Sequence, residues 1–155
     1  MSVNHVSEAQ VTSEAQATGV TWESDSPGAA RWERACLLGD LFPERGAAAL
    51  FGDVQVALFR LPDSSAGKGD GALGGPVYAV QNLDPFSGVH VMSRGIVGTR
   101  GGAPTVAAPV YKQVFSLVTG ECLVVADKSP QGDLSPDLTT YPVVIRDGVV
   151  HVGLP

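Results

Sequence analysis

The chain has 155 residues, of which 44% are hydrophobic and 17% are charged, and its formal net charge is -6. This length and composition fit one globular domain whose core needs no disulfide bonds. The negative charge argues against non-specific binding to nucleic acid or to an anionic membrane, because both need clustered Lys and Arg. No apolar run approaches the ~20 residues of a spanning helix, and no secretory leader is recognisable, so we expect a cytoplasmic protein.

The first 31 residues differ in composition from the rest of the chain. They are rich in Ser, Thr, Ala, Gln and Glu and contain no basic residue before Arg31. Such a segment has too little apolar surface to offset the entropy lost on ordering. We therefore predict a disordered N-terminal tail over residues 1–31 and one domain over residues 32–155. The 19 glycines and 11 prolines imply many turns, which favours an all-β architecture.

The first half of the domain contains a predicted hairpin. Alternating apolar residues indicate strands over residues 32–38, 47–51 and 54–60. Gly52-Asp53 separates the last two, and two residues of this type between apolar runs are typical of a β-hairpin. In the third strand Val56 and Leu58 share one face while Ala57 and Phe59 share the other, so we expect both faces to be covered at least in part.

Residues 61–76 are rich in Gly, Ser and Asp, which predicts a long flexible loop. A phosphate-binding loop is rejected here, because the Walker spacing is absent and no strand-to-helix context follows. A strand over residues 77–82 comes next. It leads into the part of the chain that carries the functional interpretation.

Two short loops, each preceded by a β-like segment, dominate the middle of the chain. They are Asp84-Pro85-Phe86-Ser87-Gly88 and Ala108-Pro109-Val110-Tyr111-Lys112-Gln113. A proline in each fixes φ and removes a backbone donor, so both loops are suited to a tight, defined shape. The second loop continues into a strand over residues 114–118, which stops at the turn Thr119-Gly120.

The last part of the domain contains the clearest hairpin. A strand over residues 121–125 is followed by a polar loop over 126–139, and then by strands over 141–146 and 149–152. Asp147-Gly148 between these two strands suits a type I′ turn. His151 alternates with valines, and we expect it to face outward. In all, about ten short strands predict an antiparallel β-sandwich or barrel.

A few isolated side chains are candidates for chemistry. Cys36 and Cys122 are far apart and lack Cys-x-x-Cys spacing, so we interpret them as semi-buried strand residues rather than a disulfide, redox pair or metal site. His90 has no ligand neighbours and is interpreted as a surface residue. Arg94 and Arg100 are better candidates for contact with an acidic partner, since a guanidinium binds carboxylates in a fork.

The two loops and the Thr119-Gly120 turn together resemble a Rieske domain, where Cys-Pro-His-x-Gly and Cys-Pro-x-His-Gly-x-x-Phe are expected. The prolines, Gly88 and Phe115 stand where that pattern places them. Lys112 replaces a glycine, and the four ligand positions hold Asp84, Phe86, Ala108 and Tyr111. A Rieske centre needs two thiolates and two imidazoles. The resemblance therefore implies a Rieske-like fold without the cluster ligands.

The amino-acid sequences of three stretches make the resemblance more specific. These stretches cover residues 82–88, 93–98 and 108–117. They closely resemble the small subunits of bacterial assimilatory NAD(P)H-dependent nitrite reductases. That family implies no cofactor and no activity for this chain alone. It also implies a large subunit as partner, which carries FAD, an iron–sulfur cluster and siroheme and reduces nitrite to ammonia. The partner-binding candidates are then Phe86, Arg94, Tyr111, Lys112 and Gln113.

Three alternatives compete with this interpretation. A stand-alone Rieske-like ferredoxin is disfavoured, because alanine and phenylalanine cannot donate electrons to iron. An independent enzyme could use Asp84, Tyr111 and Lys112 for acid–base chemistry if the loops approach each other, but no nucleophile–base–orienter arrangement supports it. A β-type protein-interaction module unrelated to nitrite is the third. Phe86 and Tyr111 could also simply fill the space left by the cluster and imidazoles.

Overall fold

The computed structural model describes residues 31–62 and 76–155. Apart from Arg31, the predicted tail lies outside the described residues, as does most of the predicted loop over 61–76. Within them, thirteen strands form antiparallel ladders, and the helices are two 3-10 turns, η1 (Leu38–Asp40) and η4 (Met92–Arg94). The predicted all-β architecture is confirmed. No helix in the described part of the chain could span a membrane.

The base of the domain is a three-stranded sheet. Its order is β1 (Arg31–Leu37), β13 (Val149–Leu154) and β12 (Val143–Arg146). The predicted hairpin between β12 and β13 is confirmed, and its turn residues Asp147 and Gly148 have φ of 53° and 77°, as a type I′ turn requires. Arg31 lies opposite Leu154, so the two ends of the described domain are neighbours.

The outward orientation predicted for His151 is wrong. This side chain is only 6% exposed. It lies on β13, the central strand of the base sheet, where Arg34 of β1 and Val144 of β12 are its direct neighbours. The alternation of histidine with valine shows which residues share a face, but it does not show that a central strand is covered on both sides.

The middle of the domain is a four-stranded sheet. Its order is β11 (Thr140–Tyr141), β4 (Val77–Gln81), β3 (Val54–Arg60) and β2 (Gly46–Phe51). The predicted hairpin across Gly52-Asp53 joins β2 to β3 in antiparallel register. Its register is consistent with the alternation read from the sequence.

Strand β3 belongs to two hydrophobic cores at once. Val56 and Leu58 contribute to a core shared with the base sheet, while Ala57 and Phe59 contribute to a second core on the opposite face. All four side chains are buried. The expectation that both faces of this strand are covered is therefore confirmed, and the middle sheet is the common wall of the two cores.

The third layer contains a four-stranded sheet and a two-stranded ribbon. The sheet order is β10 (Cys122–Val124), β9 (Val114–Ser116), β8 (Ala103–Ala107) and β7 (Ile96–Arg100), and the ribbon is β5 (Leu83–Asp84) with β6 (Val89–His90). The sequence interpretation left β7 unassigned. Its alternation is interrupted by Gly98, and a short edge strand gives a weak periodic signal.

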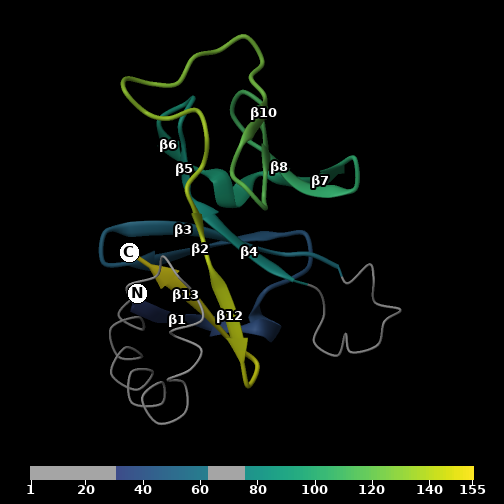
Figure 1. Ribbon diagram of the computed structural model, residues 1–155, viewed down its shortest axis with the longest axis vertical. Helices are drawn as coiled ribbons and strands as arrows, with labels where there is room; N and C mark the ends of the chain where they lie inside the picture. Colours follow the sequence, from purple (N-terminus) through teal and green to yellow (C-terminus); the bar gives the residue numbers. More distant parts are fainter. Residues whose placement is uncertain (1–30, 63–75) are drawn as a thin grey trace.

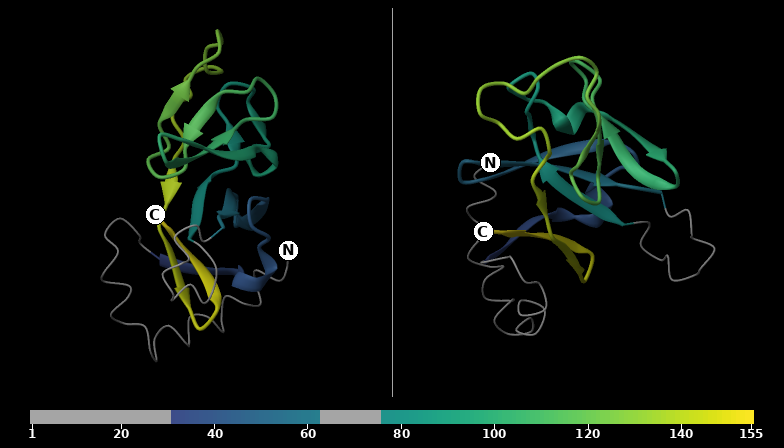
Figure 2. Two further views of the ribbon diagram at one scale, coloured as in Figure 1. Left: turned by 90° about the vertical axis from the view of Figure 1, so that its right-hand side faces the viewer. Right: turned by 45° about the horizontal axis from the view of Figure 1, so that its top comes forward.

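These layers follow one another along the long axis of the molecule. Figure 1 shows β1, β12 and β13 at one end, β2, β3 and β4 in the middle and β5 to β10 at the other end. The two further views in Figure 2 show the same separation. We call the end formed by the loops 84–88 and 108–113 the tip, and the segment 125–139 that joins β10 to β11 the strap.

One glycine fixes where the strap returns to the domain. Gly120 has a φ of 83°, and its carbonyl accepts a hydrogen bond of 2.8 Å from the backbone N–H of Leu138 in the strap. A Cβ atom at Gly120 would overlap the carbonyl oxygen of Leu138. A side chain at Gly120 would therefore have two effects: it would strain the local backbone, and it would displace the strap.

We expect Gly120→Ala to lower the free energy of unfolding by about 2 kcal/mol or more, since it combines left-handed strain with a backbone clash. Gly101→Ala is the matched control, because Gly101 has a φ of 57° and open space where a Cβ atom would lie. The control isolates the strain and should lose about 1 kcal/mol. Urea denaturation of both variants measures the difference, and equal losses would contradict the clash.

Candidate functional site

The first tip loop is closed by the carboxylate of Asp84. Its Oδ1 accepts the backbone N–H of Phe86 at 2.9 Å, and its Oδ2 accepts the hydroxyl of Ser87 at 2.8 Å. The carbonyl of Asp84 also accepts the N–H of Gly88, whose φ of 76° completes the turn. Asp84 is fully buried. Its carboxylate therefore organises the loop, and it is not available to a substrate.

Phe86 lies beneath the same loop and faces the interior. It is 1% exposed, and its ring centroid is 6.2 Å from that of Phe115 at an interplanar angle of 51°. This tilted arrangement is favourable for aromatic pairs. Phe86 thus fills the inside of the tip, as the space-filling alternative proposed, and in the free chain it is not accessible to a partner.

The second tip loop is closed at both ends by its own backbone. The N–H of Ala108 donates to the carbonyl of Gln113 at 2.8 Å, and the N–H of Lys112 donates to the carbonyl of Ala108 at 3.1 Å. Ala108 and Gln113 are fully buried, whereas Val110, Tyr111 and Lys112 are exposed. The loop therefore presents three consecutive side chains on a fixed backbone.

Lys112, at a position where the Rieske pattern has a glycine, adopts a backbone conformation that favours glycine. Its φ is 68°, in the left-handed region that costs a non-glycine residue about 1–2 kcal/mol. Its ammonium group donates to the carbonyl of Pro109 at 2.9 Å, across the loop. Lys112 is therefore the left-handed residue of this turn, and its ammonium group adds a positive charge to the surface of the loop.

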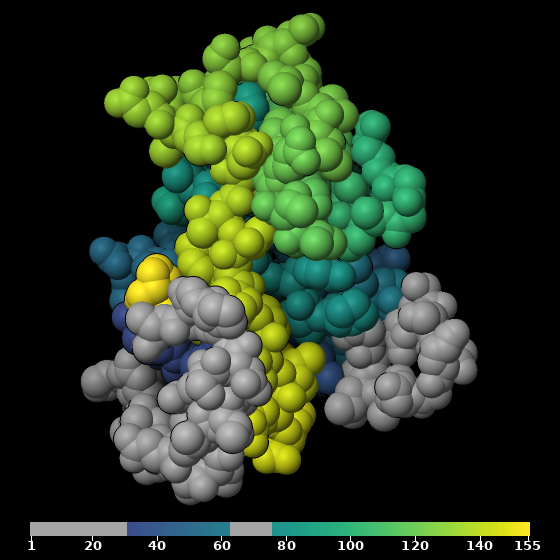
Figure 3. Space-filling model, viewed as in Figure 1, coloured from purple at the N-terminus to yellow at the C-terminus, as the bar shows by residue number. Residues whose placement is uncertain are grey.

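The strap hydrogen-bonds to both tip loops. Gln131 donates its backbone N–H to the carbonyl of Pro85 at 2.8 Å and its side-chain amide to the carbonyl of Phe86 at 3.1 Å. The side-chain amide of Gln113 donates to the carbonyl of Val125 at 3.1 Å. Figure 3 shows the strap, in yellow-green, lying across the top of the molecule. The tip therefore consists of three segments.

The strap also contacts the exposed part of the second loop. The ammonium group of Lys128 lies 4.5 Å from the centroid of the Tyr111 ring, which is a cation–π contact. Ala126 and Asp127, just before it, both have left-handed φ, 59° and 60°. These two residues reverse the chain direction, so that Lys128 returns over Tyr111.

The sequence-based candidates are therefore divided among three locations. Phe86 and Gln113 support the tip from inside, Tyr111 and Lys112 form its surface, and Arg94 lies on η4, outside the two tip loops. Sequence reasoning missed the strap as part of the site. The polar, proline-containing composition of the strap indicates an irregular segment, but it does not indicate which other loops that segment contacts.

The two cysteines are free and half-buried, as interpreted from the sequence. They lie on β1 and β10, in separate sheets. Burial raises the pKa of Cys36 to about 11, with the nearby Asp40 adding to the effect and Arg34 opposing it. Burial also raises the pKa of Cys122. Both thiols are thus protonated near neutral pH, which makes them weak nucleophiles and weak metal ligands.

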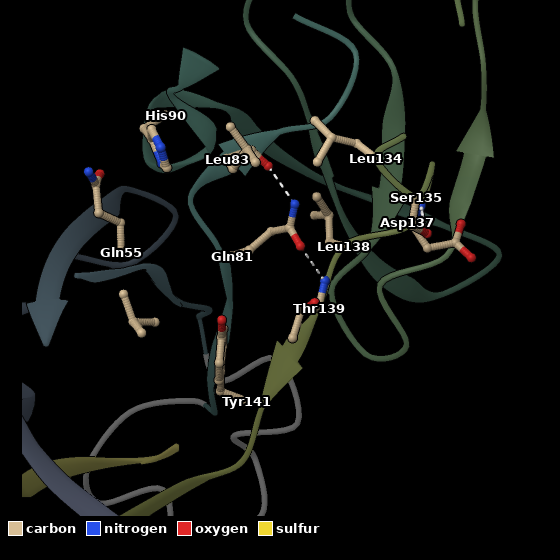
Figure 4. A pocket seen from close by; sticks show the side chains of 11 residues that line it. Gln55, Gln81, Leu83, His90, Leu134, Ser135, Asp137, Leu138, Thr139 and Tyr141 are labelled. Atoms are coloured by element: carbon tan, nitrogen blue, oxygen red, sulfur yellow. Dashed lines mark hydrogen bonds between the residues drawn. The ribbon is translucent and has the colours of Figure 1, made fainter. Parts of the chain in front are cut away.

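A hollow of about 460 Å³ lies between the middle sheet and the strap. Figure 4 shows Gln81 at its centre, with hydrogen bonds to the carbonyl of Leu83 and from the N–H of Thr139. Asp137 at its edge accepts the N–H of Cys122. These polar groups connect the strap to the sheets, and they do not form a nucleophile with its base.

Residues 31–153 match the family model of the Rieske-like [2Fe-2S] domain. The chain is also 34% identical, over 122 residues, to the small subunit of nitrite reductase (NADH) from Escherichia coli K12, covering 79% of this chain and 96% of that one. The chain belongs to the Rieske-like family of nitrite reductase small subunits. The resemblance read from the tip loops is confirmed.

Two further comparisons extend this result. A solved structure from Mycobacterium tuberculosis, described as an NADH-dependent nitrite reductase small subunit, is 41% identical with a TM-score of 0.64, covering 81% of this chain and 96% of that one. The nitrite reductase [NAD(P)H] large subunit of Klebsiella oxytoca is 35% identical over 123 residues, which are 79% of this chain but 11% of that protein. A domain of this kind is therefore part of a large-subunit polypeptide in that organism.

The family description names a [2Fe-2S] cluster, and the residues at its ligand positions do not fit one. Phe86 and Ala108 have no lone pair to donate, and the carboxylate oxygens of Asp84 already accept hydrogen bonds inside the loop. Tyr111 alone retains an exposed oxygen. Within residues 31–62 and 76–155, no group of three or more His, Cys, Asp or Glu side chains is placed to hold a metal ion.

The strain at Lys112 can be measured with two variants. Lys112→Ala and Lys112→Gly both remove the ammonium group and its bond to Pro109, but only the glycine variant relieves the left-handed backbone. We expect Lys112→Gly to be more stable than Lys112→Ala by about 1 kcal/mol in urea denaturation. An alanine variant as stable as the glycine variant would show that the loop backbone relaxes without the lysine.

The mismatch with the cluster predicts the metal content. Untagged protein purified anaerobically should contain no stoichiometric iron or acid-labile sulfide and should show no visible absorption band, because two of the four ligand positions have no donor atom. A cluster-bearing Rieske ferredoxin purified in parallel is the control. Stoichiometric iron and sulfide would contradict the donor argument and would direct attention to Cys36 and Cys122.

Proposed function

We propose that this chain is the cluster-free small subunit of an NAD(P)H-dependent nitrite reductase and that its tip docks on the large subunit. In this proposal the FAD, iron–sulfur cluster and siroheme belong to the large subunit, which reduces nitrite to ammonia. The isolated chain has no activity of its own and works in the cytoplasm. The observation that carries the proposal is a tip that keeps the Rieske-like loop geometry while presenting apolar and cationic side chains.

The composition of the tip surface supports a protein partner. Val110 is 45% exposed and Tyr111 38%, and Val125 of the strap is also exposed beside them. Aromatic and apolar anchors with a charged rim are typical of interface centres. Lys112 and Lys128 supply the rim. Because Lys128 lies over the Tyr111 ring, the aromatic anchor is already oriented before a partner arrives, which lowers the entropy lost on binding.

Backbone strain is concentrated at the same place. Of the five non-glycine residues with left-handed φ in the described part of the chain, three belong to the tip: Lys112, Ala126 and Asp127. Strain of this kind persists where the surrounding structure enforces it, and it gathers at functional sites. The conformations of the second loop and of the strap are therefore consistent with a surface maintained for binding.

The Klebsiella oxytoca protein supports the choice of partner. There, a region similar to this chain lies within a polypeptide named as the large subunit. Domains that occur in one polypeptide in one organism are held at high effective concentration, and separate chains need an interface to achieve the same proximity. We therefore assign the large subunit as the partner of this chain.

An independent acid–base activity is disfavoured by the burial of Asp84. Both of its carboxylate oxygens accept internal hydrogen bonds, so it cannot take a proton from a substrate held at the surface. Among the described residues, Tyr111 contacts Lys128 and Lys112 donates to the carbonyl of Pro109, and neither forms a hydrogen bond or ion pair with a carboxylate or imidazole. These two side chains are better suited to contact than to catalysis.

The docking proposal predicts a loss of affinity when the anchors are truncated. We expect Val110→Ala with Tyr111→Ala to weaken binding of the full-length chain to the purified large subunit by about 10-fold or more, since hot-spot truncations cost at least ~1–2 kcal/mol. Isothermal titration gives the affinity. Lys112→Ala should have a smaller effect, because rim charges contribute little.

Val118→Ala is the matched control for this experiment. Val118 is 53% exposed, like Val110, but it follows β9 at the end away from the second loop. Its truncation should leave the affinity within about twofold of wild type. Equal affinity for the wild type, for Val110→Ala with Tyr111→Ala and for Val118→Ala would remove the tip from the interface. Failure of the wild-type chain to bind would refute the subunit proposal itself.

A further inference from the structure

A second hollow, of about 690 Å³, lies on the side of the domain between β2, β6 and η4. We call it the arginine groove, because two arginines line it. Its charged and polar side chains are those of Glu44, Arg45, Gln55, Asn82, His90, Ser93 and Arg94. Neither the tip loops nor the strap contribute to this groove, so the docking surface proposed above leaves it unexplained.

A close backbone contact brings the two arginines into the same groove. Gly46 of β2 packs so tightly against η4 that a Cβ atom there would overlap the carbonyl oxygen of Ser93. Arg45 precedes Gly46 and Arg94 follows Ser93. Their side chains therefore start from either side of one contact. The pairing is built by the fold and is not visible in the sequence, where the two residues are 49 positions apart.

Both guanidinium groups are exposed and uncommitted. Neither forms an ion pair or a hydrogen bond with another described residue. Glu44 is the one carboxylate among the lining residues, against two guanidinium groups. In a chain whose formal net charge is -6, a groove lined by two arginines and one glutamate carries a local net positive charge.

The amide groups beneath the arginines make the groove a donor surface. The backbone N–H of Ser93 donates to Oδ1 of Asn82 at 2.8 Å, which fixes the orientation of that buried amide. Nδ2 of Asn82 then donates to Oε1 of Gln55 at 3.2 Å. The Nε2 group of Gln55 is consequently left as a donor, with no acceptor among the described residues. Two guanidinium groups and an amide N–H₂ therefore share one groove.

Such a set of donors fits a carboxylate. A guanidinium binds a carboxylate through two parallel hydrogen bonds, and charged pairs of this kind are the stronger hydrogen bonds in proteins. The groove also extends beyond a small anion. Gln55 and His90 line both the arginine groove and the 460 Å³ hollow beside the strap. In Figure 4 they lie at the edge of that hollow opposite Ser135 and Asp137.

We propose that the arginine groove receives an acidic segment of the large subunit, with a carboxylate held between Arg45 and Arg94. This inference rests on the proposed function, because it takes the same partner. The two hollows share Gln55 and His90, so we place the acidic segment along the side of the domain between the strap and the arginines. The tip supplies apolar contact. The charges of the groove select the partner and fix the position in which it binds.

The test measures binding of the full-length chain to the large subunit in 50 mM and 500 mM NaCl. We expect Arg45→Gln with Arg94→Gln to weaken binding by about 10-fold or more at low salt, the fold-change of one lost charged hydrogen bond. The wild type should lose affinity at high salt, and the double variant should lose less, because exposed charge pairs are screened. Arg45→Lys with Arg94→Lys should recover part of the affinity.

Arg31→Gln is the control, since Arg31 is 52% exposed on β1 of the base sheet and does not line the groove. It should bind within about twofold of wild type. Unchanged thermal melting of each variant shows that the fold is intact. If the tip variants weaken binding while the groove variants match Arg31→Gln, the groove inference is overturned and the docking proposal stands. No binding by the wild type would overturn both.

Discussion

The tip depends on hydrogen bonds that the strap makes to two loops distant in sequence. Gln131 binds the first loop through its backbone and its side chain, and Gln113 of the second loop binds the strap in return. In a cluster-bearing domain, metal–ligand bonds join these two loops. Here amide groups of Gln113 and Gln131, the internal carboxylate of Asp84 and packed phenylalanine rings hold the tip together. The chain thus has a Rieske-like fold in which hydrogen bonds and side-chain packing, and not metal–ligand bonds, hold the tip loops.

The middle sheet connects the tip to the rest of the molecule, because it packs against the cores on both of its faces. Because β3 contributes Val56 and Leu58 to one core and Ala57 and Phe59 to the other, neither core can shift without moving the wall between them. Close packing makes such a wall resistant to small displacements. The tip loops, which are irregular, are therefore mounted on a sheet whose two faces are both filled.

Local features of the fold were predictable, and distant contacts were not. Gly52-Asp53 and Asp147-Gly148 specify their hairpins through turn conformations that depend on adjacent residues. The contacts of the strap join Gln131 to Phe86 and Thr139 to Gln81, 45 and 58 residues apart. No periodic pattern encodes such pairs. The same reason explains why His151 was expected outside, and why Arg94 was a candidate without Arg45.

The pairing of Arg31 with Leu154 has a consequence for how the domain can be attached to other proteins. Both ends of the domain emerge side by side from the base sheet, which lies at the other end of the molecule from the tip (Figure 1). A linker at either end therefore leaves the tip uncovered. Such a module tolerates being tethered or being free, because covalent connection changes its local concentration and not its binding face. That geometry is compatible with both arrangements found among its relatives, a separate small chain and a segment of a much longer one.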